Sequence, residues 1–430
     1  QRLHHISMEP DTMDDDTEND AEEETTVKEA TFYNMVSIAV PTALANLAEY
    51  VPVVLTLSLV GRTEKSDKMD ALALARTYFN VTAFSISYGL ISALRTLSPQ
   101  AVGGGKAKQL QGVYAQRALI VTTIGLLPSI AFAFTAQSVL TFLGQPRNLA
   151  RLAQKYVTRL LLSLIGLNSM TILQRVLTAH DLNASNLAVC CAVAVISPAI
   201  IYVFISQFGW LGAAWAAGIY NALYVIFQVP VLIKNDLSFV FAASNFSEAC
   251  AKDGIVEYLK LATPGLIFTV LEWWSMELVL IIGGTRKKSA QIVVGALAVS
   301  LTVQMTANLT WLGLMVACAT RVGHAVGQGN VKLAMSFAWL GLRVAAVFGF
   351  VVSALNYVGR FRIAALFTHD SDVRRVFVNS APSLSLVLFF DALNNVVQGV
   401  LAGAGVPRAI AWANFGAWYG VGAPLALGLV

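Results

Sequence analysis

Long runs of apolar residues, separated by short polar stretches, cover the chain from about residue 32 to its end. An α-helix needs about 20 apolar residues to cross a hydrocarbon core of about 30 Å, and each run has about that length or more. The runs predict eleven membrane spans, near 32–60, 71–98, 115–143, 152–178, 187–208, 210–233, 256–283, 288–318, 332–358, 375–402 and 409–430. The pattern therefore predicts an all-α polytopic membrane protein.

The first six spans and the remaining five repeat one another in sequence. A motif from Gly89 to Lys108 recurs from Gly313 to Lys332, and we call the separation of these two copies the repeat offset. With a slip of one position, both halves also open with Pro-x7-Glu-x11-Gly. Such a match is improbable by chance, so we expect two pseudo-symmetric six-helix bundles with the same membrane orientation and substrate between them. The partner of span 210–233 would begin beyond residue 430, so we expect the last helix to be missing from this chain.

These patterns predict four segments: an acidic tail at 1–31, an N-lobe of six spans at 32–233, a polar inter-lobe linker at 234–255, and a C-lobe of five spans at 256–430. Of the 25 Asp and Glu residues, 11 fall within the first 30 positions. Low hydrophobicity with a high net charge is typical of disordered segments. The tail is therefore expected to be disordered.

Composition narrows the function class. With 56% hydrophobic and 13% charged residues, the chain falls outside the range of water-soluble enzymes. The four cysteines show no metal-site spacing, and no basic patch indicates a nucleic-acid partner. We expect a monomer, with no enzymatic activity and no cofactor, whose partners are the lipid bilayer and small organic substrates. Lys and Arg lie on loops of both sides, so loop charge does not decide orientation.

Four carboxylates fall inside predicted spans: Glu49, Glu272, Glu277 and Asp391. A charge at the centre of a membrane helix costs about 2.5–3.5 kcal/mol, so such residues usually face a cavity. A carboxylate in a cavity can exchange protons. The alternative is that one or more snorkel from a span end or form a hydrogen bond to a neighbouring helix.

Two polar stripes with helical spacing accompany these acids. The first follows Asp391 at i+3, i+4 and i+7, and the second lies on an earlier span. The stripes consist of Asn394, Asn395 and Gln398, and of Gln304, Asn308 and Trp311. Lining of a wet cavity and hydrogen bonding between helices both remain open.

Two carboxylates and two indoles lie within six residues, as Glu272, Trp273, Trp274 and Glu277. Aromatic faces beside a carboxylate suit an organic cation. The alternative is that the tryptophans anchor the helix at the membrane interface or pack within the bundle. Glu272 and Glu277 are about 140° apart around a helix, so these four side chains cannot all face one cavity.

Three motifs show a family resemblance: GLISALRTLSPQAVGGGK from Gly89, LEWWSMELVLIIGG from Leu271 and TRVGHAVGQGN from Thr320. FTHDSDV and QGVLAGAG follow in the same order. From about residue 32 to 430, the chain resembles the eukaryotic branch of the multidrug and toxic compound extrusion (MATE) family. The resemblance implies twelve helices in two lobes and a cytoplasmic N-terminus. It also implies export of organic cations or similar amphiphilic compounds in exchange for protons by alternating access, with Glu272 and Asp391 as the proton and cation site and Glu277 nearby.

The chain departs from its relatives at Arg95, Pro99 and His324, where they usually have an acid, Gly and Asn, and it has Glu49 where plant-like relatives tend to have Gln. These departures favour one alternative, a non-transporting degenerate paralogue. Two others stay open: a lipid or lipid-linked sugar flippase, and coupling to sodium, which carboxylate, Asn and Gln oxygens suit. A flippase would need several basic residues in its cavity, whereas most Lys and Arg here lie in loops or near span ends. We expect a multi-pass protein of the plasma membrane or a vacuolar-type membrane.

Overall fold

The computed structural model describes residues 29–64, 66–284, 290–422 and 424, without the side chains of 276–284, 290 and 291. Within these ranges the chain forms helices and no strand. The helices of the first half are α1 (Phe32–Thr63), α2 (Ser66–Phe79), the π-helix η2 (Asn80–Phe84), α3 (Ser85–Ile91), α4 (Leu94–Gly103), α5 (Ala107–Gly125), α6 (Leu127–Phe142), α7 (Arg147–Leu160), α8 (Ser163–Ala179), α9 (Asn183–Phe208), η3 (Gly209–Leu211) and α10 (Gly212–Lys234). Those of the second half are η4 (Ser238–Phe241), α11 (Asn245–Ala249), α12 (Lys252–Gly284), α13 (Ala290–Gly327), α14 (Val331–Phe367), α15 (Ser371–Gly403), α16 (Pro407–Phe415) and the π-helix η5 (Gly416–Gly422).

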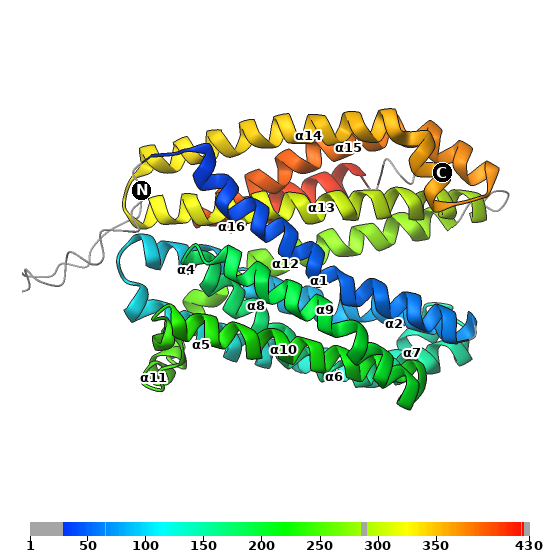
Figure 1. Ribbon diagram of the computed structural model, residues 1–430, viewed down its shortest axis with the longest axis horizontal. Coiled ribbons are helices and arrows are strands. Elements are labelled where there is room, and N and C mark those ends of the chain that lie inside the picture. The colour runs from blue at the N-terminus through cyan, green and yellow to red at the C-terminus, as the bar shows by residue number, and fades with distance from the viewer. Residues whose placement is uncertain (1–28, 65, 285–289, 423, 425–430) are drawn as a thin grey trace, which may run out of the picture.

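The helices form two bundles that lie side by side (Figure 1). Helices α13–α16 make up one bundle and α2–α10 the other, while α1 runs obliquely between them and packs against both α9 and α13. Helix α12 packs in the equivalent way against α3 and α16. The first helix of each half therefore contacts the other half, and the predicted all-α fold of two pseudo-symmetric bundles is confirmed.

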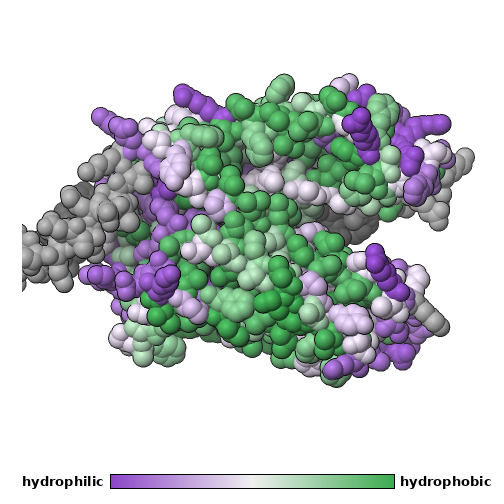
Figure 2. Space-filling view, in the orientation of Figure 1, coloured by the Kyte–Doolittle hydropathy of each residue, from purple (hydrophilic) through white to green (hydrophobic). Residues whose placement is uncertain are grey.

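A broad apolar surface identifies the part of the molecule that faces lipid. Apolar side chains cover the middle of the molecule, and polar ones gather at its two ends (Figure 2). Large apolar residues such as Phe134, Val195 and Phe350 are more than 60% exposed on this surface. An apolar surface of this extent is unfavourable in water, so it is stable only where lipid covers it. The chain is a multi-pass membrane protein.

Each of the eleven predicted runs corresponds to helical structure, although fewer pass a test of length and apolarity. Among the described residues, seven stretches pass, or eight if the bent pair α7 and α8 forms one span. The stretch 183–234 contains two helices, α9 and α10, joined by a turn at Gly209. Predicted span 71–98 is divided among α2, η2, α3 and α4 and is not among these stretches, and the described part of span 409–430 consists of the short α16 followed by η5.

The sequence repeat is also a repeat of backbone geometry. Gly105 and Gly329, which are separated by the repeat offset, both adopt a positive φ, of 69° and 71°. At the same offset, Asp181 and Gly405 have φ values of 60° and 78°. Only glycine adopts this conformation without strain, although Asp tolerates it better than most residues. Matching turns in the two halves show that they share one fold.

The segment between the bundles is held against the first one. Arg117 of α5 donates hydrogen bonds to the carbonyls of Glu248, at 2.8 Å, and Ala249, at 3.2 Å, in the short helix α11. Gln116 donates to the carbonyls of Val240 and Ala242. These contacts fix the start of α12, which begins at Lys252.

Candidate functional site

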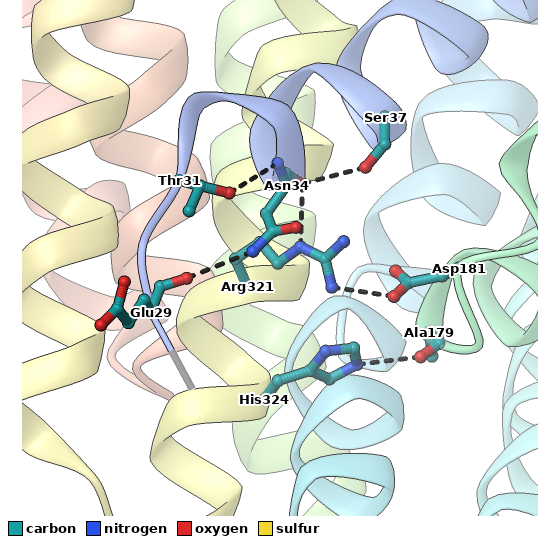
Figure 3. A network of polar contacts seen from close by, with 8 residues as sticks. All are labelled: Glu29, Thr31, Asn34, Ser37, Ala179, Asp181, Arg321 and His324. Atoms are coloured by element: carbon teal, nitrogen blue, oxygen red, sulfur yellow. Dashed lines mark hydrogen bonds and ion pairs between the residues drawn. The ribbon is translucent and has the colours of Figure 1, made fainter. Parts of the chain in front are cut away.

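The two bundles meet at the end of the molecule where α1 begins, which we call the N-terminal end (Figure 1). Gln100 Nε2 donates to the carbonyl of Gly403 at 2.9 Å, and His324 Nε2 donates to the carbonyl of Ala179 at 2.8 Å (Figure 3). The two donors are separated in sequence by the repeat offset, and so are the two acceptors. These two hydrogen bonds are therefore pseudo-symmetry mates, and we call the contact that they form the gate.

An ion pair strengthens one side of the gate. Arg321 Nη1 lies 2.8 Å from Asp181 Oδ2, and Arg321 Nε donates to the carbonyl of Asn34 at 2.9 Å (Figure 3). At the repeat offset, the mates of Arg321 and Asp181 are Leu97 and Gly405, which cannot form this pair. Because Asn34 lies in the first turn of α1, this second contact of Arg321 also fastens that helix to the closed end.

Replacing Asp181 with Asn should weaken the gate without disturbing the turn, since Asn tolerates a positive φ as Asp does. The Arg321 side chain is 4% exposed and would lose its charged partner. Because Asp181 is 42% exposed, we expect a cost of only about 1–2 kcal/mol. The measurement is the rate at which a thiol reagent added at the N-terminal end modifies a cysteine placed at Ala101, the buried neighbour of Gln100 in α4. A rate equal to that without the substitution would contradict the assigned role.

Away from the gate the bundles diverge (Figure 2). A cavity of about 100 Å³ lies between them, lined by residues of α1, η2, α3, α8, α9 and α13. Glu49 is in its wall, where its Oε1 accepts hydrogen bonds from Gln174 Nε2 and, at 3.2 Å, from Cys190 Sγ. The structure thus places Glu49 at a cavity, with both hydrogen-bond donors from its own bundle.

Asp391 of α15 lies among amides. Asn308 Nδ2 of α13 is 3.4 Å from one carboxylate oxygen, and Asn395 Nδ2 is 3.4 Å from the other. Gln398, about two turns further along α15, is buried, and its Nε2 has no partner among the described residues. Of the remaining stripe residues, Gln304 and Asn394 are partly exposed and Trp311 is fully buried. Both predicted stripes therefore contribute an amide to the environment of Asp391.

Glu272 of α12 lies within electrostatic range of both Asp391 and Arg95. Its neighbour Trp273 stacks on Phe84 of the other bundle, with ring centroids 5.0 Å apart. Trp274 points away from this stack and is 48% exposed, as expected for neighbouring residues on a helix. The side chain of Glu277 lies outside the described residues. Among the described residues, no group of His, Cys, Asp and Glu could hold a metal ion.

Two arginines at this site did not stand out in the sequence as cavity residues. Arg95 lines a small cavity with Gln398, and Arg175 lines the cavity of Glu49. Both lie near the ends of predicted spans, as most basic residues do. In the folded protein these span ends pack against the other bundle near the gate. Both guanidinium groups therefore face the space between the bundles. The tendency of basic residues to lie near span ends therefore does not exclude them from the cavity.

The chain is similar to known transporters along almost its whole length. The MatE family model matches residues 41–203 and 264–427. Protein DETOXIFICATION 12 of Arabidopsis thaliana is 30% identical over 403 residues, which cover 92% of this chain and 82% of that protein.

Two solved structures share the fold. A crystal structure of the eukaryotic MATE transporter AtDTX14 has a TM-score of 0.84 and 27% identity, and covers 92% of this chain and 89% of its own. A transporter of the MOP superfamily from Pyrococcus furiosus, described as having a binding pocket of reverse polarity, has a TM-score of 0.82 at 16% identity, with coverage of 92% and 89%. Its low identity supports the fold alone. Since the family model matches more than half of the chain, the protein belongs to the multidrug and toxic compound extrusion (MATE) family of efflux transporters.

Proposed function

We propose that this protein exports small organic cations or similar amphiphilic compounds in exchange for protons. The observation that carries the proposal is the Asp391 carboxylate, which lies between the amides of Asn308 and Asn395 in the C-lobe, with Glu272 of α12 as a second acid within electrostatic range of it. Two nearby acids repel each other when both are ionised, so a proton shared between them is favoured. A cation or a proton can relieve the same repulsion, which makes their binding competitive and allows exchange.

Alternating access would come from the gate. In the arrangement described here the gate is closed at the end that carries the N-terminus, which the family resemblance assigns to the cytoplasm. This arrangement then corresponds to the outward-open state. Binding of a proton from outside would favour closure of the outer end and opening of the gate, because a ligand shifts an equilibrium toward the state that binds it better.

The amides around Asp391 argue against sodium as the driving ion. Sodium would need several oxygen ligands, whereas Asn308 and Asn395 each direct a side-chain N–H toward the Asp391 carboxylate. These donors fit the carboxyl group in both its ionised and its neutral form. They leave few oxygens free to coordinate a cation.

The test uses purified protein in lipid vesicles, with proton and sodium gradients imposed separately and uptake of ethidium measured as the aromatic cation. We expect a proton gradient to drive uptake and a protonophore to abolish it, while a sodium gradient alone has no effect. Uptake driven by sodium would show that the coupling ion is wrong. Absence of uptake under either gradient would favour the non-transporting alternative.

A further inference from the structure

The ring of Tyr88 contacts two guanidinium groups on the wall of the N-lobe. The centroid of the ring is 4.8 Å from Arg95 Cζ and 5.7 Å from Arg175 Cζ. Arg175 Nη2 also donates to Tyr88 Oη at 3.3 Å. A cation over an aromatic face is attracted to it, so Tyr88 holds the two arginines near each other despite their like charge.

Neither arginine has an anionic partner at contact distance within the described part of the chain. The ion pairs found there are Lys68–Glu64 and Arg321–Asp181. Arg95 makes one weak polar contact, to Met315 Sδ at 3.7 Å, and the Nε atoms of Arg95 and Arg175 are buried without a hydrogen-bond partner. Both arginines are partly buried and line cavities, so donors of their guanidinium groups remain available to a ligand, and such a fork of donors matches a carboxylate.

Aromatic rings lead from this pair of arginines to the other bundle. Phe84 stacks with Tyr88 at a centroid distance of 6.0 Å and with Trp273 at 5.0 Å. Phe84 and Tyr88 line the cavity that also contains Arg175. An aromatic compound in this cavity would lie beside the rings of Phe84 and Tyr88 with Arg175 in the same wall, while Arg95 lines the small neighbouring cavity on the other side of the Tyr88 contact.

We propose that Arg95 and Arg175 form an anion-binding subsite that takes the carboxylate of an aromatic compound, and that aromatic carboxylates are among the compounds this protein transports. The transport part rests on the function proposed above, whereas the binding part does not. Glu49 lies within electrostatic range of Arg175 and partly offsets its charge, while Arg95 extends the positive wall toward Glu272. The cleft therefore has a basic N-lobe wall and an acidic C-lobe wall.

The experiment measures equilibrium binding of fluorescein, an aromatic carboxylate, by fluorescence anisotropy to the whole protein in lipid nanodiscs. Ethidium serves as the cationic probe, and no ion gradient is present. We expect Arg95→Gln and Arg175→Gln each to weaken fluorescein binding about tenfold or more, because each removes a charge-assisted hydrogen bond. Ethidium should bind equally well or more tightly, since a positive charge has been removed.

Two further variants separate binding from folding. Arg95→Lys keeps the charge and should recover part of the fluorescein affinity, and Arg343→Gln removes an exposed arginine of α14 and should change nothing. The proposal is overturned if wild-type protein does not bind fluorescein, if both Gln variants bind it normally, or if each loses both probes equally. Failure of proton coupling in the vesicle experiment would leave this binding result unchanged, so the two proposals can fail separately.

Discussion

Asp391→Asn and Glu272→Gln are each expected to reduce proton-driven ethidium uptake at least tenfold. Each substitution keeps the shape of the side chain but removes its titratable proton, and with it the mutual repulsion of the two acids. A loss of about 1.4 kcal/mol of coupling free energy corresponds to a tenfold change. The measurement is initial uptake into vesicles under an imposed pH gradient, normalised to the amount of reconstituted protein.

Glu257→Gln is the matched control, because Glu257 lies on the same helix as Glu272 but is exposed. It should transport as the wild type does. Counterflow, in which unlabelled ethidium inside the vesicles exchanges for labelled ethidium outside, needs no net proton movement. We expect it to survive in the two amide variants if they still bind substrate. Normal proton-driven uptake in both would rule out these carboxylates as the coupling pair.

The two-bundle fold could be predicted from the sequence because the pattern that specifies it occurs twice. The repeat offset that relates Gly105 to Gly329 also relates their positive φ angles, and it extends to the hydrogen bonds of the gate. A run of apolar residues also reports helix length directly. Helix length and turn conformation are set by residues that are close together in the sequence. These features can therefore be predicted without knowledge of the tertiary contacts.

The breaks within helices and the partners of the charged residues were not predictable in this way. A proline often indicates a break in a helix, but none lies near the π-helix η2 in the run 71–98. The nearest proline is Pro99, in α4. The pairing of Asp181 with Arg321 joins residues 140 positions apart, and it departs from the repeat. The sequence places Arg95 and Arg175 near span ends. They line cavities only because those span ends meet at the gate in the folded protein. Such features depend on tertiary contacts that hydropathy does not encode.

Gly103→Ala and Gly327→Ala are expected to prevent closure of the gate and to reduce transport at least tenfold. A Cβ on Gly103 would overlap the backbone of His324, and one on Gly327 would overlap the backbone of Gln100. Backbone cannot move aside as a flexible side chain can, so the bundles must separate at this end. Overpacking by a single methyl group typically costs about 1–3 kcal/mol, enough to shift a closely balanced equilibrium between open and closed gates.

The separation can be measured by electron paramagnetic resonance, as the distance between spin labels on cysteines introduced at Lys106 and Gln328, one on each side of the gate. Both alanine variants should shift the distance distribution to longer values, whereas Gly218→Ala should not, because nothing lies within 4 Å of a Cβ at that glycine of α10. The pseudo-symmetry makes the prediction stricter. Since Gly103 and Gly327 are mates, the two variants should open the gate to a similar extent, and an effect confined to one would show that the two sides of the gate do not close by the same contact.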